Sequence, residues 1–157
     1  MAKSLGAEQR LYELGIVLPT APQPFGAYVE SVQSGRVIFL SGMLPVVDHK
    51  PQFVGRLGKE LDIESGRAAL QTASMSALAA ARGHLGTLDR VTRVVRLGVY
   101  LATSGDFIDH AKVADAASEL FEGVFGQDKT SVRTVLRVAS LPFGMPVELE
   151  VILEVAE

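Results

Sequence analysis

The chain has 157 residues, no cysteine and a formal net charge of −3. This length predicts one domain with a buried core, and the missing cysteine excludes disulfides, thiol catalysis and zinc–thiolate sites. The acidic balance gives no general attraction to nucleic acid, and no apolar run is long enough to cross a membrane. We therefore expect a cytoplasmic protein without a membrane segment or signal peptide.

Hydrophobic spacing and turn residues predict two long helices among short strands. The expected elements are a helix over 4–14, an extended proline segment over 18–26, strands over 27–33 and 36–42, a turn-rich segment over 44–60 with a short strand near 52–54, a helix over 63–85, a strand over 89–102, a helix over 107–124, and strands over 131–140 and 146–155. Ser34-Gly35 is typical of a hairpin turn, and Asp62 is the expected N-cap of the alanine-rich helix that follows it.

The order β-β-α-β-α-β-β predicts a mixed α/β (α+β) fold, with one sheet and both helices on one of its faces. Residues 1–157 are expected to form a single domain, with 1–22 as an N-terminal helical extension. In the last strand, valines and leucines alternate with Glu148, Glu150, Ile152 and Glu154. The second sheet face is thus part apolar and part charged, which favours burial against a partner, so we expect a homo-oligomer.

Motifs for metal, phosphate or nucleophilic serine chemistry are not found. The histidines His49, His84 and His110 have no metal-ligand spacing and no framing carboxylates. The glycines around Gly83 and Gly86 suit a helix end and a turn rather than a phosphate loop. We predict no metal and no cofactor.

The last two predicted strands carry Arg133, Arg137, Glu148 and Glu150 among valines and leucines. Cross-strand ion pairs on a solvated face would explain these charges. If "LPFGMP" is a hairpin turn, however, Val138 lies opposite Leu149, and Arg133 lies about 17 Å along the strand from Glu148. In that register Arg133 and Glu148 meet only across a subunit boundary.

Four blocks of the sequence are distinctive: "FGAYVESVQSGRVIFLSGMLPV", the alanine-rich helix ending "LGTLDRVTRVV", "DFIDHAKVADAASELF" and "SVRTVLRVASLPFGMPVELEVI". Together they resemble the RidA/YjgF family of enamine/imine deaminases, also known as L-PSP endoribonuclease-like proteins, from about Pro24 to Val155. The longer N-terminus and "RLGKELDIESG" are similar to a longer-chain subgroup. The resemblance implies a chorismate-mutase-like fold, a homotrimer, and clefts between its subunits.

The resemblance also implies roles for individual residues. Arg133 would hold a substrate carboxylate through two parallel hydrogen bonds, and Glu148 would position water and move protons with a raised pKa. Tyr28 and the backbone of Ser41, Gly42 and Met43 would line the cleft. Simpler explanations stay open: a surface ion pair for Glu148, a tyrosine at a subunit seam, and a strand-ending turn at Ser41-Gly42.

Two positions depart from the family pattern. The chain has no asparagine, so the family's cleft asparagine is replaced by Ala114 or Asp115, and a family cysteine is replaced by Val135. A carboxylate at Asp115 would be unfavourable beside an anionic substrate, and an exposed helix position is the simpler expectation for it. These departures affect which substrate the cleft would accept more than they affect whether a pocket exists.

The function implied is hydrolysis of short-chain 2-enamine or 2-imine carboxylates to 2-keto acids and ammonia, without a cofactor. The alternative is a trimer that binds a small carboxylate such as a keto acid without turnover, as a regulatory protein. A ribonuclease is disfavoured, because the chain is acidic and shows no basic groove. The partners expected are therefore a small carboxylate and further copies of the chain, with neither nucleic acid nor membrane.

Overall fold

The computed structural model describes residues 4–157, so the first three residues of the predicted extension over 1–22 lie outside the description. Its helices are α1 (Ala7–Glu13), α2 (Ile63–Leu85) and α3 (His110–Phe125), and its strands are β1 (Ser31–Ser34), β2 (Val37–Leu40), β3 (Val46–Val47), β4 (Lys50–Pro51), β5 (Val91–Ala102), β6 (Val132–Val138) and β7 (Val147–Val155). The order β1-β2-α2-β5-α3-β6-β7 matches the predicted β-β-α-β-α-β-β. The mixed α+β class is confirmed.

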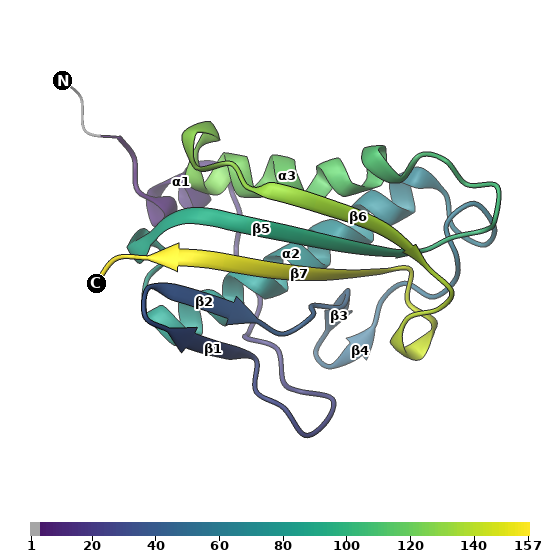
Figure 1. Cartoon of the computed structure of the whole chain (residues 1–157), viewed down its shortest axis with the longest axis horizontal. Coiled ribbons are helices and arrows are strands. Elements are labelled where there is room, and N and C mark those ends of the chain that lie inside the picture. Colours follow the sequence, from purple (N-terminus) through teal and green to yellow (C-terminus); the bar gives the residue numbers. More distant parts are fainter. Residues whose placement is uncertain (1–3) are drawn as a thin grey trace.

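One five-stranded sheet has the spatial order β1-β2-β7-β5-β6. The strands β5 and β6 are parallel and are joined through α3, while all other neighbours are antiparallel. Helices α2 and α3 pack on the same face of this sheet, behind the strands in Figure 1. The opposite face, called the open face below, carries no helix among the described residues.

The predicted hairpin between the last two strands is wrong, because β5 lies between β6 and β7. Leu149 and Val135 are both paired with Val99, so Val138 does not lie opposite Leu149. Consecutive residues Leu97–Val99 of β5 are buried, which suits a central strand with a neighbour along each edge. With twelve residues β5 is the longest strand, and it pairs with β7 along one edge and β6 along the other.

The long helix α2 agrees with its prediction at both ends. The Asp62 side chain accepts a hydrogen bond from the Ser65 N–H at 2.8 Å, and Gly86 ends the helix with a φ of 85°. The alanines of the predicted face are all buried: Ala69, Ala73, Ala77, Ala80 and Ala81. Small side chains let α2 lie close to β7 and α3.

The segment between β2 and α2 differs from its prediction. A short strand was expected near 52–54, whereas the structure has the small hairpin β3–β4 with Asp48 and His49 at its turn. The first predicted strand, over 27–33, is also shorter, since β1 begins at Ser31. In the described part of the chain, no helix combines the length and hydropathy required to cross a membrane.

Candidate functional site

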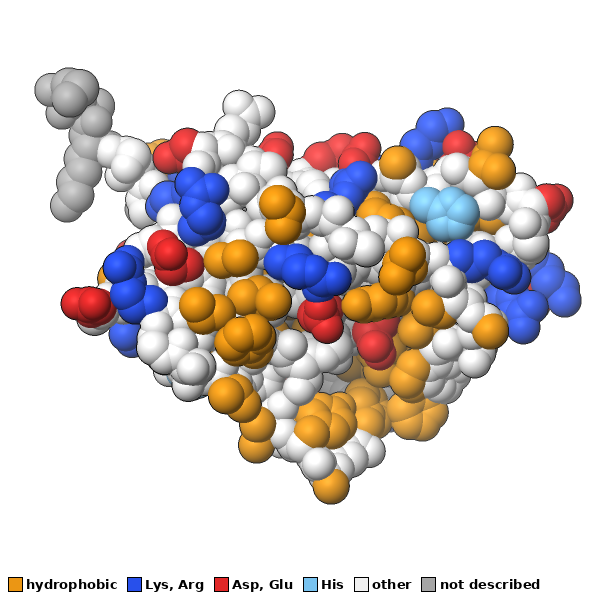
Figure 2. All heavy atoms as spheres, viewed as in Figure 1, with side chains coloured by type: hydrophobic (Ala, Val, Ile, Leu, Met, Phe, Trp, Pro, Cys, Tyr) orange, Lys and Arg blue, Asp and Glu red, His pale blue; other side chains and the backbone are white. Residues whose placement is uncertain are grey.

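A hollow of about 460 Å³ opens at the edge of the open face, where β7 begins and β2 ends. Its lining residues are Phe25, Tyr28, Ser41, Gly42, Leu44, Pro142, Phe143 and Glu148. Figure 2 shows the open face with a depression below the strands and hydrophobic side chains around it. Four predicted site residues, Tyr28, Ser41, Gly42 and Glu148, therefore meet in one cavity, which we call the Glu148 hollow.

Glu148 supplies the carboxyl group of this hollow. It is partly buried, and it has no hydrogen-bond or ion-pair partner among residues 4–157. Burial raises its pKa above the ordinary value, and the nearby Glu150 carboxylate raises it further. An unpaired carboxyl group with a raised pKa holds a proton more readily than an ordinary exposed carboxylate does, which suits it to taking and returning a proton.

Gly42 allows the carboxyl group of Glu148 to lie against the backbone. A Cβ at position 42 would lie only 2.8 Å from Glu148 Oε2 and 2.9 Å from its Cδ. The neighbouring residues are fixed, because the Ser41 N–H donates to Glu30 O at 2.9 Å and the Met43 N–H donates to Leu149 O at 2.7 Å. The Gly42 N–H between them has no hydrogen-bond partner in the described chain. It is therefore free to donate to a bound ligand.

Tyr28 and Ser41 form part of the wall through contacts of their own. The Phe25 N–H donates to the Tyr28 hydroxyl oxygen at 3.0 Å, which leaves the phenol proton for another acceptor. The Ser41 hydroxyl donates to Val29 O at 2.6 Å, so it holds the wall rather than facing a ligand freely. Met43 does not line this hollow, because its side chain is buried in the core.

Arg133 lies on the opposite face of the sheet from Glu148. Arg133 is in register with Leu97, and Glu148 is in register with Tyr100, three residues farther along the same strand. Since successive side chains alternate between faces, this odd offset directs the two side chains to opposite sides. The sheet therefore separates them within one chain, although the hairpin register proposed from the sequence was wrong.

Arg133 is instead held by helix α3. Its Nη1 donates to Asp115 Oδ1 at 2.8 Å and to Ser118 Oγ at 3.1 Å. Asp115 is thus a half-exposed helix residue, but one that partly neutralises the guanidinium. Nε and Nη2 of Arg133 make no hydrogen bond with the described residues, which leaves one edge of the guanidinium able to donate. The internal ion pair weakens Arg133 as a receptor for anions in the isolated chain.

Several wall residues were missed by sequence reasoning. Phe25, Leu44, Pro142 and Phe143 give the Glu148 hollow its apolar surface. Phe143 adopts a φ of 58°, in the left-handed region that few large residues occupy. The proline-rich turns that hold Phe25 and Phe143 were the available signal, but such turns give no indication of what they enclose.

The other charges on the sheet form an ordinary ion pair. Glu150 accepts a hydrogen bond from Arg96 on the neighbouring strand β5, so the cross-strand explanation holds for Glu150 but with a different arginine. Among residues 4–157, no cluster of three or more histidine or acidic side chains is placed to hold a metal ion.

Comparison with known proteins identifies the family. Residues 8–153 match the family model described as "YjgF/chorismate mutase-like, putative endoribonuclease". Protein TCP17 of Trypanosoma cruzi is 39% identical over 145 residues, covering 92% of this chain and 91% of that protein. A 2-iminobutanoate/2-iminopropanoate deaminase of Dermatophagoides farinae is 28% identical over 136 residues, covering 86% and 91%.

A solved structure supports the same assignment. The crystal structure of Atu1372 from Agrobacterium tumefaciens, a protein of unknown function, superposes with a TM-score of 0.87 at 32% identity, covering 96% of this chain and 92% of that one. The resemblance noted from the sequence blocks is thereby confirmed. The chain belongs to the YjgF/RidA family.

Proposed function

We propose that the chain hydrolyses short-chain 2-imine or 2-enamine carboxylates to 2-keto acids and ammonia. The observation that carries this proposal is the unpaired Glu148 carboxyl group, partly buried beside Gly42 in a largely apolar hollow. The 28% identity to a protein named 2-iminobutanoate/2-iminopropanoate deaminase supports the reaction class. No cofactor is required, because the carbon of a protonated imine is already electrophilic.

In the proposed reaction, the oxygen of a water molecule attacks the imine carbon while Glu148 accepts a proton from that water. The new carbon–oxygen bond gives a carbinolamine, and the same carboxyl group then returns the proton to nitrogen. Glu148, ionised again, takes the hydroxyl proton of the carbinolamine as the carbon–nitrogen bond breaks, so that the ketone forms and ammonia leaves. The free Gly42 N–H donates to the substrate and orients it, and the phenol of Tyr28 lies in the same wall. Imine hydrolysis proceeds unaided, so the catalytic demand is modest.

Arg133 enters this reaction only through a second copy of the chain. We propose a homotrimer in which β6, an edge strand of the sheet, brings Arg133 to the Glu148 hollow of a neighbour. Its free guanidinium edge would then bind the substrate carboxylate. The open face supports association, because Val32, Phe39, Ile152 and Val132 lie there in one cross-strand row. Arg96 interrupts this row between Ile152 and Val132, and its charge is paired with Glu150. Figure 2 shows hydrophobic side chains spread over this face.

The test is ammonia release from 2-aminoacrylate generated in situ, compared between the wild-type chain, Arg133→Ala and Arg137→Ala. Arg137 lies on the same strand and is exposed, so its replacement controls for the loss of a positive charge. We expect a large loss for Arg133→Ala and a wild-type rate for Arg137→Ala. A wild-type rate of ammonia release in Arg133→Ala, equal to that of Arg137→Ala, would refute the role of Arg133. A keto acid that raises the melting temperature while no ammonia is released would instead favour a binding protein.

A further inference from the structure

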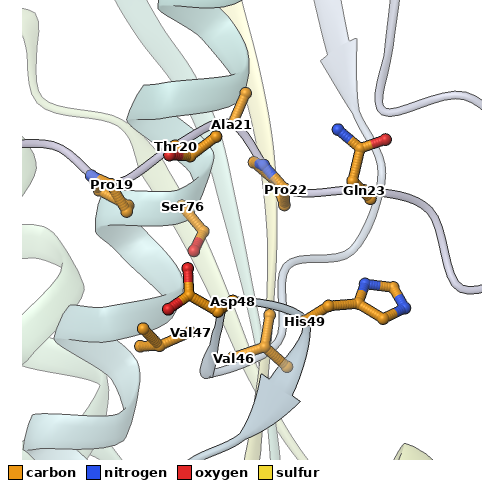
Figure 3. Close-up of a pocket in the computed structure, with 10 residues that line it drawn as sticks. All are labelled: Pro19, Thr20, Ala21, Pro22, Gln23, Val46, Val47, Asp48, His49 and Ser76. Carbon is orange, nitrogen blue, oxygen red and sulfur yellow. The ribbon is translucent and has the colours of Figure 1, made fainter.

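A second hollow, of about 190 Å³, lies between the proline-rich segment 19–23, the β3–β4 hairpin and helix α2 (Figure 3). Its lining residues are Pro19, Thr20, Ala21, Pro22, Gln23, Val46, Val47, Asp48, His49 and Ser76. It shares no lining residue with the Glu148 hollow, and the proposed reaction does not use it. We call it the Asp48 hollow.

Ser76 presents to this hollow a hydroxyl group that has no hydrogen-bond partner among the described residues. The residue is only 3% exposed, and its Oγ makes no hydrogen bond with any described residue. Two positions earlier on the same helix, the buried Ser74 donates to Leu70 O at 2.7 Å, which is the usual solution for a helical serine. Among the described residues, Ser104 Oγ is the one buried side-chain oxygen without a partner, so Ser76 Oγ is reached by solvent from the hollow. A bound group could replace that solvent as the hydrogen-bond partner of Ser76.

Asp48 faces Ser76 from the hairpin turn. Asp48 and His49 have φ values of 51° and 63°, so the turn is left-handed at both residues. The His49 ring turns away and stacks on Phe25 at a centroid distance of 3.9 Å, whereas the Asp48 carboxylate points toward Ser76 (Figure 3). Asp48 forms no ion pair with the described residues, and no lysine or arginine lines the hollow.

We propose that the Asp48 hollow binds a short-chain primary ammonium compound. The ammonium group would donate to the Asp48 carboxylate and to Ser76 Oγ, satisfying the two unpaired polar groups at once. The alkyl chain would contact Pro19, Pro22 and Val46 on the apolar walls. The volume equals that of about six water molecules in the liquid, which restricts the ligand to a few heavy atoms. This inference is independent of the proposed deaminase reaction.

The experiment is a titration of the full-length, ¹⁵N-labelled chain with n-propylammonium chloride, followed by NMR. We expect saturable shifts of the amide signals of Asp48, His49 and Ser76. The variant Asp48→Asn should lose this saturation, while Ser76→Ala should bind at least about tenfold more weakly. Both variants should fold, because asparagine tolerates the left-handed region and alanine favours helices.

Three controls make the result decisive. Asp106→Asn removes an exposed carboxylate that lies outside the hollow, and it should bind like the wild-type chain. 1-Propanol has the same tail without the charge, and sodium chloride at equal concentration reproduces the ionic strength. Shifts that never saturate overturn the proposal. So do shifts that 1-propanol reproduces, or an equal response from Asp48→Asn and Asp106→Asn.

Discussion

Replacing Gly42 with alanine tests the geometry of the Glu148 hollow most directly. The added Cβ would lie 2.8 Å from Glu148 Oε2, so the carboxyl group must retreat by about 0.6 Å to reach the 3.4 Å at which ordinary contacts begin. Gly42 does not occupy the left-handed region, so the added methyl group introduces no backbone strain. A misplacement of about 1 Å at a reacting group can reduce a rate by roughly 10²-fold. We therefore expect kcat/KM to fall by about 10- to 100-fold.

Stability should respond much less than activity. The Glu148 side chain can change its rotamer at a cost of about 0.5–1.5 kcal/mol, so Gly42→Ala should remain folded. The control is Gly105→Ala, because a Cβ at Gly105 would meet nothing within 4 Å and the residue also has no positive φ. The assay is ammonia release over a pH series, with thermal unfolding of the same samples. Wild-type kcat/KM in Gly42→Ala, at every pH, would refute the assigned position of Glu148.

Three further predictions concern charge and assembly. The pKa of Glu148 is raised in the folded chain, so ionised Glu148 lowers stability as the pH rises above the ordinary pKa of 4.5. Between that pH and neutrality, the unfolding free energy of Glu148→Gln should therefore increase relative to that of the wild-type chain. Urea denaturation at several pH values measures this difference. Asp115→Asn should release Arg133 and tighten the binding of 2-oxobutyrate by about two- to fivefold in calorimetry, the scale of a partly exposed ion pair; unchanged affinity would contradict the competition. Phe39→Glu should dissociate the proposed trimer in sedimentation, whereas Val17→Glu, which alters an exposed residue outside the sheet, should leave it intact.

The helices could be predicted closely, because their signals are local. The N-cap Asp62 and the alanine spacing determine where α2 begins and which side is buried, and both can be read within one segment. Strand pairing depends on distant residues instead. The turn at Pro142 was typical of a hairpin, yet β7 crosses to the far side of β5 and leaves β6 at the edge of the sheet.

Part of the residue set that lines the Glu148 hollow was predictable, but the arrangement of the candidate site was not. Tyr28, Gly42 and Glu148 were named from sequence blocks and lie in one hollow. The pairing of Arg133 with Asp115 was not foreseen, because it requires the register of β6 against α3. No periodicity in the sequence places a strand residue opposite a particular helix residue.

Phe25 contributes to both the Glu148 hollow and the Asp48 hollow. Its side chain lines the Glu148 hollow, while its ring stacks on His49, whose turn forms part of the Asp48 hollow. Truncating this one ring would remove a wall from the first hollow and the support of the turn at the second. A loss of activity or binding after such a truncation therefore cannot be assigned to one hollow alone. Genetic dissection of the two hollows should start from their carboxylates, each of which belongs to one of them alone.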